Sequence, residues 1–172
     1  MGLRPARVDR GVKKRSFTRT AVKVHKKNFI KGVPGLKVRM FNMGDRKLIG
    51  DVKVSLVPKQ AVQVRHNALE AGRVAANAHM KKNVANEEYF LKVNVFPHQI
   101  LREHAQAAVA QADRFYQGMA HPFGRPKGRA ARVKEGQTIL SIRTSNENIP
   151  HAKEAFRRAS AKMPLACRIV IE

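Results

Sequence analysis

The sequence is poor in the side chains on which disulfides, thiolate metal sites and aromatic base recognition depend. Tryptophan is absent, and the 172 residues include two tyrosines and one cysteine. The single Cys167 cannot form an internal disulfide, which fits a reducing compartment, and it cannot build a thiolate cage for zinc. Without tryptophan, and with only two phenol rings, stacking on the bases of a single strand is not the expected way of binding a nucleic acid.

Acidic residues and long apolar runs are also lacking. Twelve Asp and Glu stand against 35 Lys and Arg, which leaves a formal net charge of +23. Self-repulsion at such a charge opposes compaction unless a polyanion neutralises it, so nucleic acid and an anionic membrane surface are the candidate partners. No run of about 18 or more apolar residues is present, so we expect no membrane-spanning helix. The basic N-terminus is not followed by an apolar segment, so it does not predict a signal peptide.

The glycine-rich basic stretch "GMAHPFGRPKGRAARV", residues 118–133, raises the question of a nucleotide-binding loop. A phosphate-binding loop of NTPases needs Gly-x-x-x-x-Gly-Lys-Ser/Thr. Here the spacing and the hydroxyl are missing, and Pro126 removes a backbone donor. The seven histidines are scattered, with no two placed four apart on a helix, and no nucleophile has a base beside it. We therefore expect no enzyme activity, no cofactor, no metal and no small-molecule substrate.

The hydrophobic pattern predicts an α+β fold in one domain. Apolar and polar residues alternate in four segments, which indicates strands, and two segments have helical spacing. A hairpin is expected over 129–144, with its turn at Glu135 and Gly136, and residues 99–118 are expected to be helical or mobile. The expected strands cover 36–41, 51–57, 89–98 and 167–172, and the expected helices cover 66–83 and 149–164. The regular βαβα order of a parallel sheet is absent, so we expect a mostly antiparallel sheet sandwich with two helices packed on one face.

Each expected helix has an apolar stripe. In the first helix Asn67 is the expected N-cap, and Arg73 is expected on the polar side, in an i,i+3 pair with Glu70. The expected stripe of the first helix is Ala71, Val74, Ala75 and Ala78; that of the second helix is Ala152, Ala155, Phe156, Ala159 and Met163.

Three clusters of basic residues suggest a distributed surface for phosphates. Residues 1–31 contain eleven Lys and Arg but only one acid, Asp9, so we expect a basic N-terminal arm ahead of an α+β domain over 32–172. A second cluster lies within 125–132, and a third on the exposed face of the last helix, at Arg157, Arg158 and Lys162. One such cluster is usually only a solvated face, but three with little acid between them favour backbone contact with nucleic acid.

Several motifs then resemble a known family. "RPAR" at Arg4–Arg7, "GVPGLKVRMFNMG" at Gly32–Gly44, "ALEAGRVAAN" at Ala68–Asn77 and "ADRFYQGM…FGRPKGRAARVKEGQTILSIRT" at Ala112–Thr144 occur in order, followed by "EAFRRASAKMP". Together they resemble the archaeal and eukaryotic ribosomal protein family L-ten-e, whose bacterial counterpart is L-sixteen. The resemblance covers nearly the whole chain, and the block at Gly118–Thr144 is its most specific part.

The resemblance implies an α+β sandwich docked on large-subunit rRNA in the cytoplasm, close to neighbouring ribosomal proteins and to the peptidyl transferase centre. It also implies that the protein helps aminoacyl-tRNA to settle, through a mobile loop at about 102–115 that includes Arg102, His104 and Arg114. Motif and charge together give the expected rRNA contacts: Arg4, Arg7, Arg10, Lys13, Lys14, Arg15, Arg19, Lys26, Lys27, Arg125, Lys127, Arg129 and Arg132. A basic protein that binds any nucleic acid and an enzyme acting on RNA are the alternatives.

Overall fold

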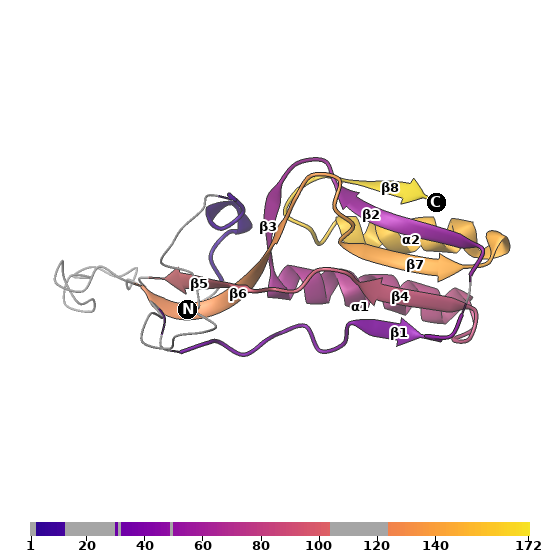
Figure 1. Ribbon diagram of the computed structural model, residues 1–172, viewed down its shortest axis with the longest axis horizontal. Coiled ribbons are helices and arrows are strands. Elements are labelled where there is room, and N and C mark those ends of the chain that lie inside the picture. Colours follow the sequence, from indigo (N-terminus) through magenta and orange to yellow (C-terminus); the bar gives the residue numbers. More distant parts are fainter. Residues whose placement is uncertain (1–2, 13–29, 31, 49, 104–123) are drawn as a thin grey trace.

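The computed structural model describes residues 3–12, 30, 32–48, 50–103 and 124–172. These residues form two antiparallel sheets and two α-helices (Figure 1), so the predicted α+β class is confirmed. Among them no helix has the length and apolar composition that crossing a bilayer requires. The elements are η1 (Ala6–Val8), β1 (Asn42–Gly44), β2 (Val52–Pro58), β3 (Val62–Arg65), α1 (His66–Asn83), β4 (Tyr89–Val93), β5 (Gln99–Glu103), β6 (Arg125–Val133), β7 (Leu140–Thr144), η5 (Asn146–Asn148), α2 (Ile149–Ser160) and β8 (Cys167–Ile171).

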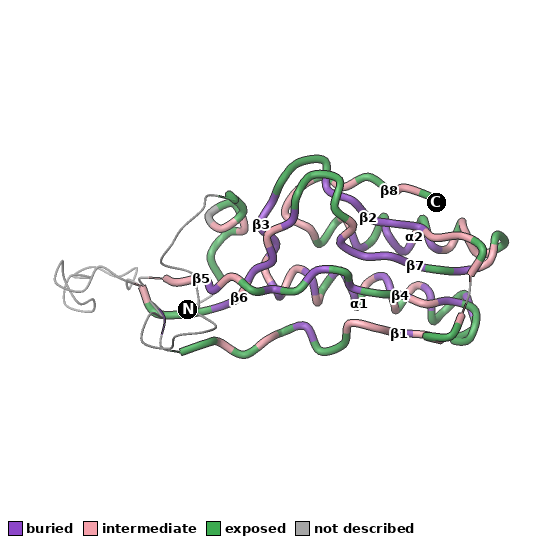
Figure 2. The backbone as a smooth tube through the Cα atoms, in the orientation of Figure 1, coloured by how far each residue is buried: buried purple, intermediate pink, exposed green. Residues whose placement is uncertain are grey.

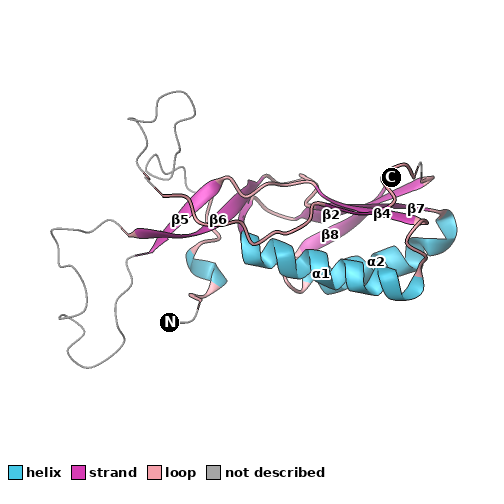
Figure 3. Ribbon diagram, turned by 90° about the horizontal axis from the view of Figure 1, so that it is seen from below, coloured by secondary structure: helices cyan, strands magenta, loops and turns pink. Residues whose placement is uncertain are grey.

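The larger sheet has five strands in the order β1-β4-β7-β2-β8, and both helices lie on one of its faces (Figure 3). Ile142 of β7 lies opposite Leu91 of β4 and Val54 of β2, so these three buried side chains form a row across the sheet. Phe156 of α2 is fully buried in the same core. Burial of this apolar layer is the main source of stability, and Figure 2 shows it as buried backbone along the central strands.

The smaller sheet has three strands in the order β3-β6-β5 and extends away from the helices to one end of the molecule (Figure 1). β6 pairs with β3 from Val133 to Ala130 and with β5 from Ala130 to Arg125. The second pairing contains a register irregularity beside Arg102, of the kind that a β-bulge produces. β6 therefore links the core to the far end of the small sheet.

The predicted hairpin over 129–144 is wrong in its pairing. The turn lies at Glu135 and Gly136 as expected, and Gly136 has a φ of 76° that suits glycine. However, β6 pairs with β3 and β5, whereas β7 pairs with β2 and β4. The turn therefore carries the chain from one sheet to the other, which an alternating pattern of side chains cannot distinguish from a hairpin.

The predicted strand over 36–41 and the predicted helical or mobile segment over 99–118 also need correction. The backbone N–H groups of Lys37 and Arg39 donate to His66 Nδ1 at 3.4 Å and to Glu70 Oε2 at 3.2 Å. Side chains of α1 thus take the place of a neighbouring strand, and the extended segment forms no ladder until Asn42. Residues 99–103 form β5, and residues 104–123 lie outside the described part of the chain.

α1 has the predicted limits, but its buried face is different from the predicted one. The expected stripe of small residues at 71, 74, 75 and 78 is largely exposed. The large residues Leu69 and Met80, which are fully buried, define the face that packs on the sheet, because they bury more apolar area than alanine. The N-cap is Arg65 rather than Asn67, and no side chain caps the helix.

The predicted pair of Glu70 and Arg73 is confirmed, with Arg73 Nη2 donating to Glu70 Oε1 at 2.6 Å. Arg73 is buried and not on the polar side, since its Nη1 also reaches the sulfur of Met43 at 3.0 Å.

α2 begins and packs as predicted, through the buried stripe from Ala152 to Ala159. Met163 follows the end of α2 and packs against Gly72 of α1, where a Cβ would lie 2.6 Å from its methyl carbon.

Substitution of Gly44 by alanine tests a tight contact between β1 and the backbone at the start of β4. Gly44 has a φ of 79°, and a Cβ there would overlap the carbonyl oxygen of Tyr89. We expect Gly44→Ala to lower the free energy of unfolding by about 3 kcal/mol, because backbone strain and overlap add. Gly136→Ala is the matched control: its φ is similar but the space around it is open, so it should cost only about 1 kcal/mol. Urea unfolding measures both, and equal losses would contradict the account.

Candidate nucleic-acid interface

Residues 3–12 lie along the outer edge of β3 in the small sheet. Gln63 of β3 donates from its backbone N–H to the carbonyl of Arg10 at 2.9 Å, and from its side chain to the carbonyl of Asp9 at 2.7 Å. Arg65 at the end of β3 donates to the carbonyl of Arg4 at 2.7 Å. These bonds place three of the predicted rRNA contacts, Arg4, Arg7 and Arg10, beside the small sheet.

Glu103 ties three segments of this region together. Its carboxylate accepts from Arg4 Nε at 2.6 Å and from Lys127 Nζ at 2.6 Å, so it joins β5, β6 and the N-terminal segment. The hydrogen bonds from Lys127 and then from Arg4 lower the pKa of the Glu103 carboxyl, so Glu103 is ionised at neutral pH. Lys127 and Arg4 are still 38% and 49% exposed, so both cations can face a partner as well.

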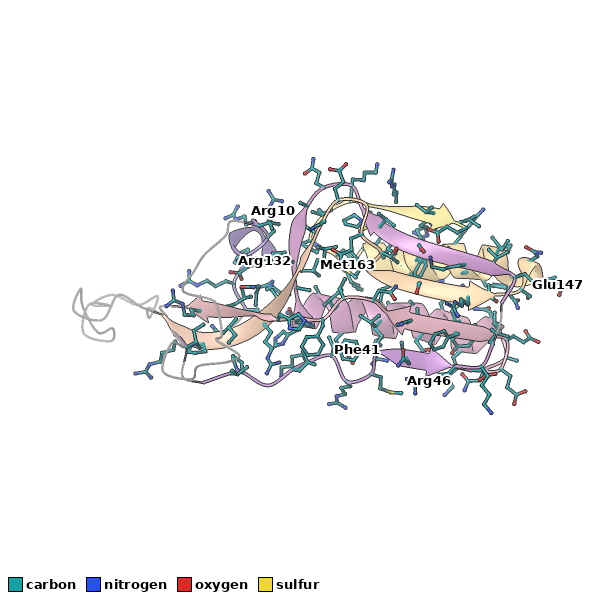
Figure 4. All side chains as sticks on the ribbon, viewed as in Figure 1. Arg10, Phe41, Arg46, Arg132, Glu147 and Met163 are labelled. Atoms are coloured by element: carbon teal, nitrogen blue, oxygen red, sulfur yellow. The ribbon has the colours of Figure 1, made fainter. Side chains whose placement is uncertain are left out.

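The structure brings most of the described candidates to the small-sheet end. Arg125, Lys127, Arg129 and Arg132 all lie on β6, and Arg125 is exposed near the tip. The Nε of Arg129 donates to the carbonyl of Pro34 at 2.7 Å, which fixes the side chain beside the start of the described segment 32–48. Figure 4 shows the labelled side chains of Arg10 and Arg132 in this half of the molecule, whereas Glu147 lies at the opposite end.

Arg102 lies on a strand and not in the predicted loop. Arg102 lies on β5 opposite Pro126, so it belongs to the small sheet and not to a loop. The predicted loop at 102–115 thus begins after Glu103 at the earliest. The candidates outside the described part of the chain are Lys13, Lys14, Arg15, Arg19, Lys26, Lys27, His104 and Arg114.

A pocket that sequence reasoning missed lies within this region. It has a volume of about 360 Å³ and is lined by the N-terminal segment, the start of α1, β5 and β6. Arg65 and His66 line it at the point where β3 becomes α1. Burial, followed by the nearby charges of Lys37 and Arg129, lowers the pKa of His66, so its ring is neutral at pH 7. No local motif marks this pocket, because its walls come from four separate parts of the sequence.

The basic cluster on α2 lies apart from the small sheet and repeats the pairing of two cations with one carboxylate. Arg157 and Arg158 both donate to Glu154, at 2.6 and 2.9 Å, and these bonds lower the pKa of Glu154 to about 2. The charges on this helix are thus partly neutralised by a neighbour one turn away. Because its pairing resembles that of Glu103, this cluster is a matched control for the small-sheet end that differs in position and not in kind of charge.

The described residues hold no evident catalytic arrangement. Within them, no group of three or more His, Cys, Asp and Glu side chains is placed to hold a metal ion. Cys167 is half-buried on β8, and burial raises the pKa of its thiol, so the thiol is poorly reactive at neutral pH. The chemistry that the described surface offers is charge and hydrogen-bond donation toward an anion.

Comparison with known proteins agrees with this chemistry. The family model described as ribosomal protein L16p/L10e matches residues 17–170, nearly the whole chain. The chain belongs to the L16p/L10e family of ribosomal proteins. The large ribosomal subunit protein uL16 of Archaeoglobus fulgidus is 48% identical over all of this chain and 94% of its own length. The proteins of the same name from Staphylothermus marinus and Methanococcus maripaludis are 44% and 42% identical, over 100% and 99% of this chain and 95% of their own length.

Membership in this family confirms the predicted resemblance. It also decides between a structural protein of the ribosome and an enzyme. L16p/L10e proteins are structural components of ribosomes and not enzymes, so this chain is a ribosomal structural protein. The alternative of an enzyme acting on RNA is therefore excluded.

Substitution of Glu103 by glutamine tests the two ion pairs that join β5 to β6 and to the N-terminal segment. The folded state lowers the pKa of Glu103, so its contribution to stability is present above about pH 4.5 and is lost as the pH falls through the lower, folded-state pKa. At pH 7 we expect Glu103→Gln to reduce the free energy of unfolding by about 1 kcal/mol. Urea titrations of both proteins at pH 7 and pH 3 should show that this difference shrinks in acid. A difference that is as large at pH 3 would show that the carboxylate charge is not responsible.

Proposed function

We propose that this protein is a constituent of the large ribosomal subunit in the cytoplasm. It binds large-subunit rRNA with its small-sheet end and its N-terminal arm, and it helps to position aminoacyl-tRNA near the peptidyl transferase centre. The names of its archaeal relatives support the first part. One observation carries the second: Arg4, Lys127 and Arg129 line one pocket beside the small sheet, Glu103 pairs with two of them, and Arg125 lies on the same strand β6.

The arrangement of this end suits contact with an RNA backbone. Phosphate contacts come from guanidinium and ammonium groups and from backbone N–H groups, and they need no base-specific geometry. On β6, Arg125 and Lys127 are exposed and Arg129 is partly exposed, so these cations can contact phosphates. A neighbouring ribosomal protein is the expected partner of the remaining surface.

The salt dependence of RNA binding tests the small-sheet end. We expect the double variant Arg125→Ala/Arg129→Ala to bind a large-subunit rRNA fragment more weakly. The slope of log affinity against log salt should fall by about 1 for each phosphate that the variant no longer neutralises. The control is Arg157→Ala/Arg158→Ala, which removes the same charge from α2 and should leave the slope unchanged. Equal effects of the two double variants would mean that only net charge matters.

The tRNA part of the proposal rests on the segment that joins β5 to β6. Glu103 at the end of β5 lies opposite Arg125 at the start of β6, and the family resemblance implies that the residues between them point toward aminoacyl-tRNA. The segment carries the candidates His104 and Arg114.

Subunits that carry Arg114→Ala test this part. The variant should still co-sediment with large subunits on a sucrose gradient, because the rRNA contacts are intact, but accommodation of aminoacyl-tRNA should be slower. Arg168→Ala on β8 is the matched control and should not change the rate. Wild-type protein that sediments only in small complexes would contradict a ribosomal role, and an unchanged rate in Arg114→Ala would contradict the tRNA contact.

A further inference from the structure

The pocket at the small-sheet end has a surplus of positive charge. Five cationic side chains line it, and only Asp9 and Glu103 are acidic. Glu103 accepts from Arg4 and Lys127, and Asp9 lies 3.7 Å from Arg65, so two acidic side chains face five cationic ones in the wall. Its volume of about 360 Å³ exceeds what a bound water needs and leaves room for a group the size of a phosphate. The cations are Arg4, Arg65, Arg102, Lys127 and Arg129.

The start of α1 forms part of the same wall. Arg65 is the N-cap, no side chain caps the helix, and the first turn has no acidic residue. The first N–H groups of an 18-residue helix therefore lack a capping acceptor, and together with the helix dipole they favour an anion at this point. Asn67, in the first turn, also lines the pocket.

His66 supplies a second and independent indication of a ligand. The residue is only 8% exposed, and its Nδ1 accepts from the backbone N–H of Lys37, so the proton of the neutral ring is on Nε2. Within the described part of the chain, no hydrogen bond is formed by that Nε2. It faces Gly128, where a Cβ would lie 3.4 Å away, and it lies on the pocket wall. This donor opens into the pocket, so an oxygen of a ligand bound there can accept from it.

We propose that this pocket binds one backbone phosphate of RNA, with a phosphate oxygen accepting from His66 Nε2. The other oxygens face the N-terminal N–H groups of α1 and the surrounding guanidinium groups. This inference rests on the proposed function, and it names a contact that the charge pattern does not reveal. Gly128 keeps the space beside His66 open, and Arg125 near the tip of the same strand extends the cationic surface along the RNA.

Variants of His66 separate this contact from the general charge of the protein. His66→Leu removes the donor at similar size, whereas His66→Gln keeps an N–H at the same number of bonds from the backbone. For the full-length chain and a large-subunit rRNA fragment, we expect His66→Leu to weaken binding by about tenfold and His66→Gln to retain most of the affinity. The salt slope should not change in either variant, since a neutral ring displaces no counterion. His151→Leu on α2 is the matched control and should bind as the wild type does.

Gly128→Ala tests access to the pocket, because the added methyl group would fill the space against His66. It should also weaken RNA binding, and it should leave the free energy of unfolding nearly unchanged. NMR of the wild-type protein gives a readout that does not depend on any variant. The ring resonances of His66 should shift when RNA is added, at constant ionic strength.

These measurements separate failure of the pocket from failure of the proposed function. RNA binding with unshifted His66 resonances, or with full affinity in His66→Leu, overturns the pocket proposal and leaves the proposed function standing. A shift that inorganic phosphate alone saturates, and that RNA does not compete with, identifies a site for free anions and also overturns it. Absence of binding to large-subunit RNA by the wild type overturns the proposed function itself. A shift with RNA that is lost in Gly128→Ala supports the proposal.

Discussion

Glu103 accepts a hydrogen bond from Arg4 and another from Lys127, and this shared carboxylate illustrates the constraint under which the whole chain folds. Because 12 acidic residues face 35 basic ones, one carboxylate can pair with two cations. Glu154 likewise holds Arg157 and Arg158. Such sharing stabilises local structure, but the acidic residues are too few to neutralise the positive charge. A bound polyanion would lower the electrostatic repulsion that remains.

The two sheets are stabilised in different ways. The five-stranded sheet and its helices bury the apolar core and are stable through packing. In the small sheet Val62, Val64, Ala131 and Val133 join this core, whereas its outer part is held by hydrogen bonds to residues 3–12 and by the ion pairs of Glu103. An RNA backbone that neutralises its cations would therefore stabilise this half as it binds.

The sequence predicts the elements of this protein better than their partners. Both helices begin where their patterns indicate, since helical spacing is local, but the buried face of α1 depends on Leu69 and Met80 meeting a distant sheet. The segment at 36–41 alternates like a strand, yet α1 side chains satisfy its backbone. The cations of β6 are evident from composition, whereas the pocket at His66 is not, because four separate segments enclose it. The sequence reveals the positive charge of the protein. Only the fold shows where the charged side chains come together.

Cross-linking of RNA to protein by ultraviolet light in purified large subunits tests the central claim most directly. If the small-sheet end faces rRNA, mass spectrometry should find RNA-linked peptides from residues 3–12 and from β6. Peptides of α2 should carry no RNA, although Arg157 and Arg158 are exposed there. RNA attached chiefly to α2, with none on β6, would contradict the assignment of the interface.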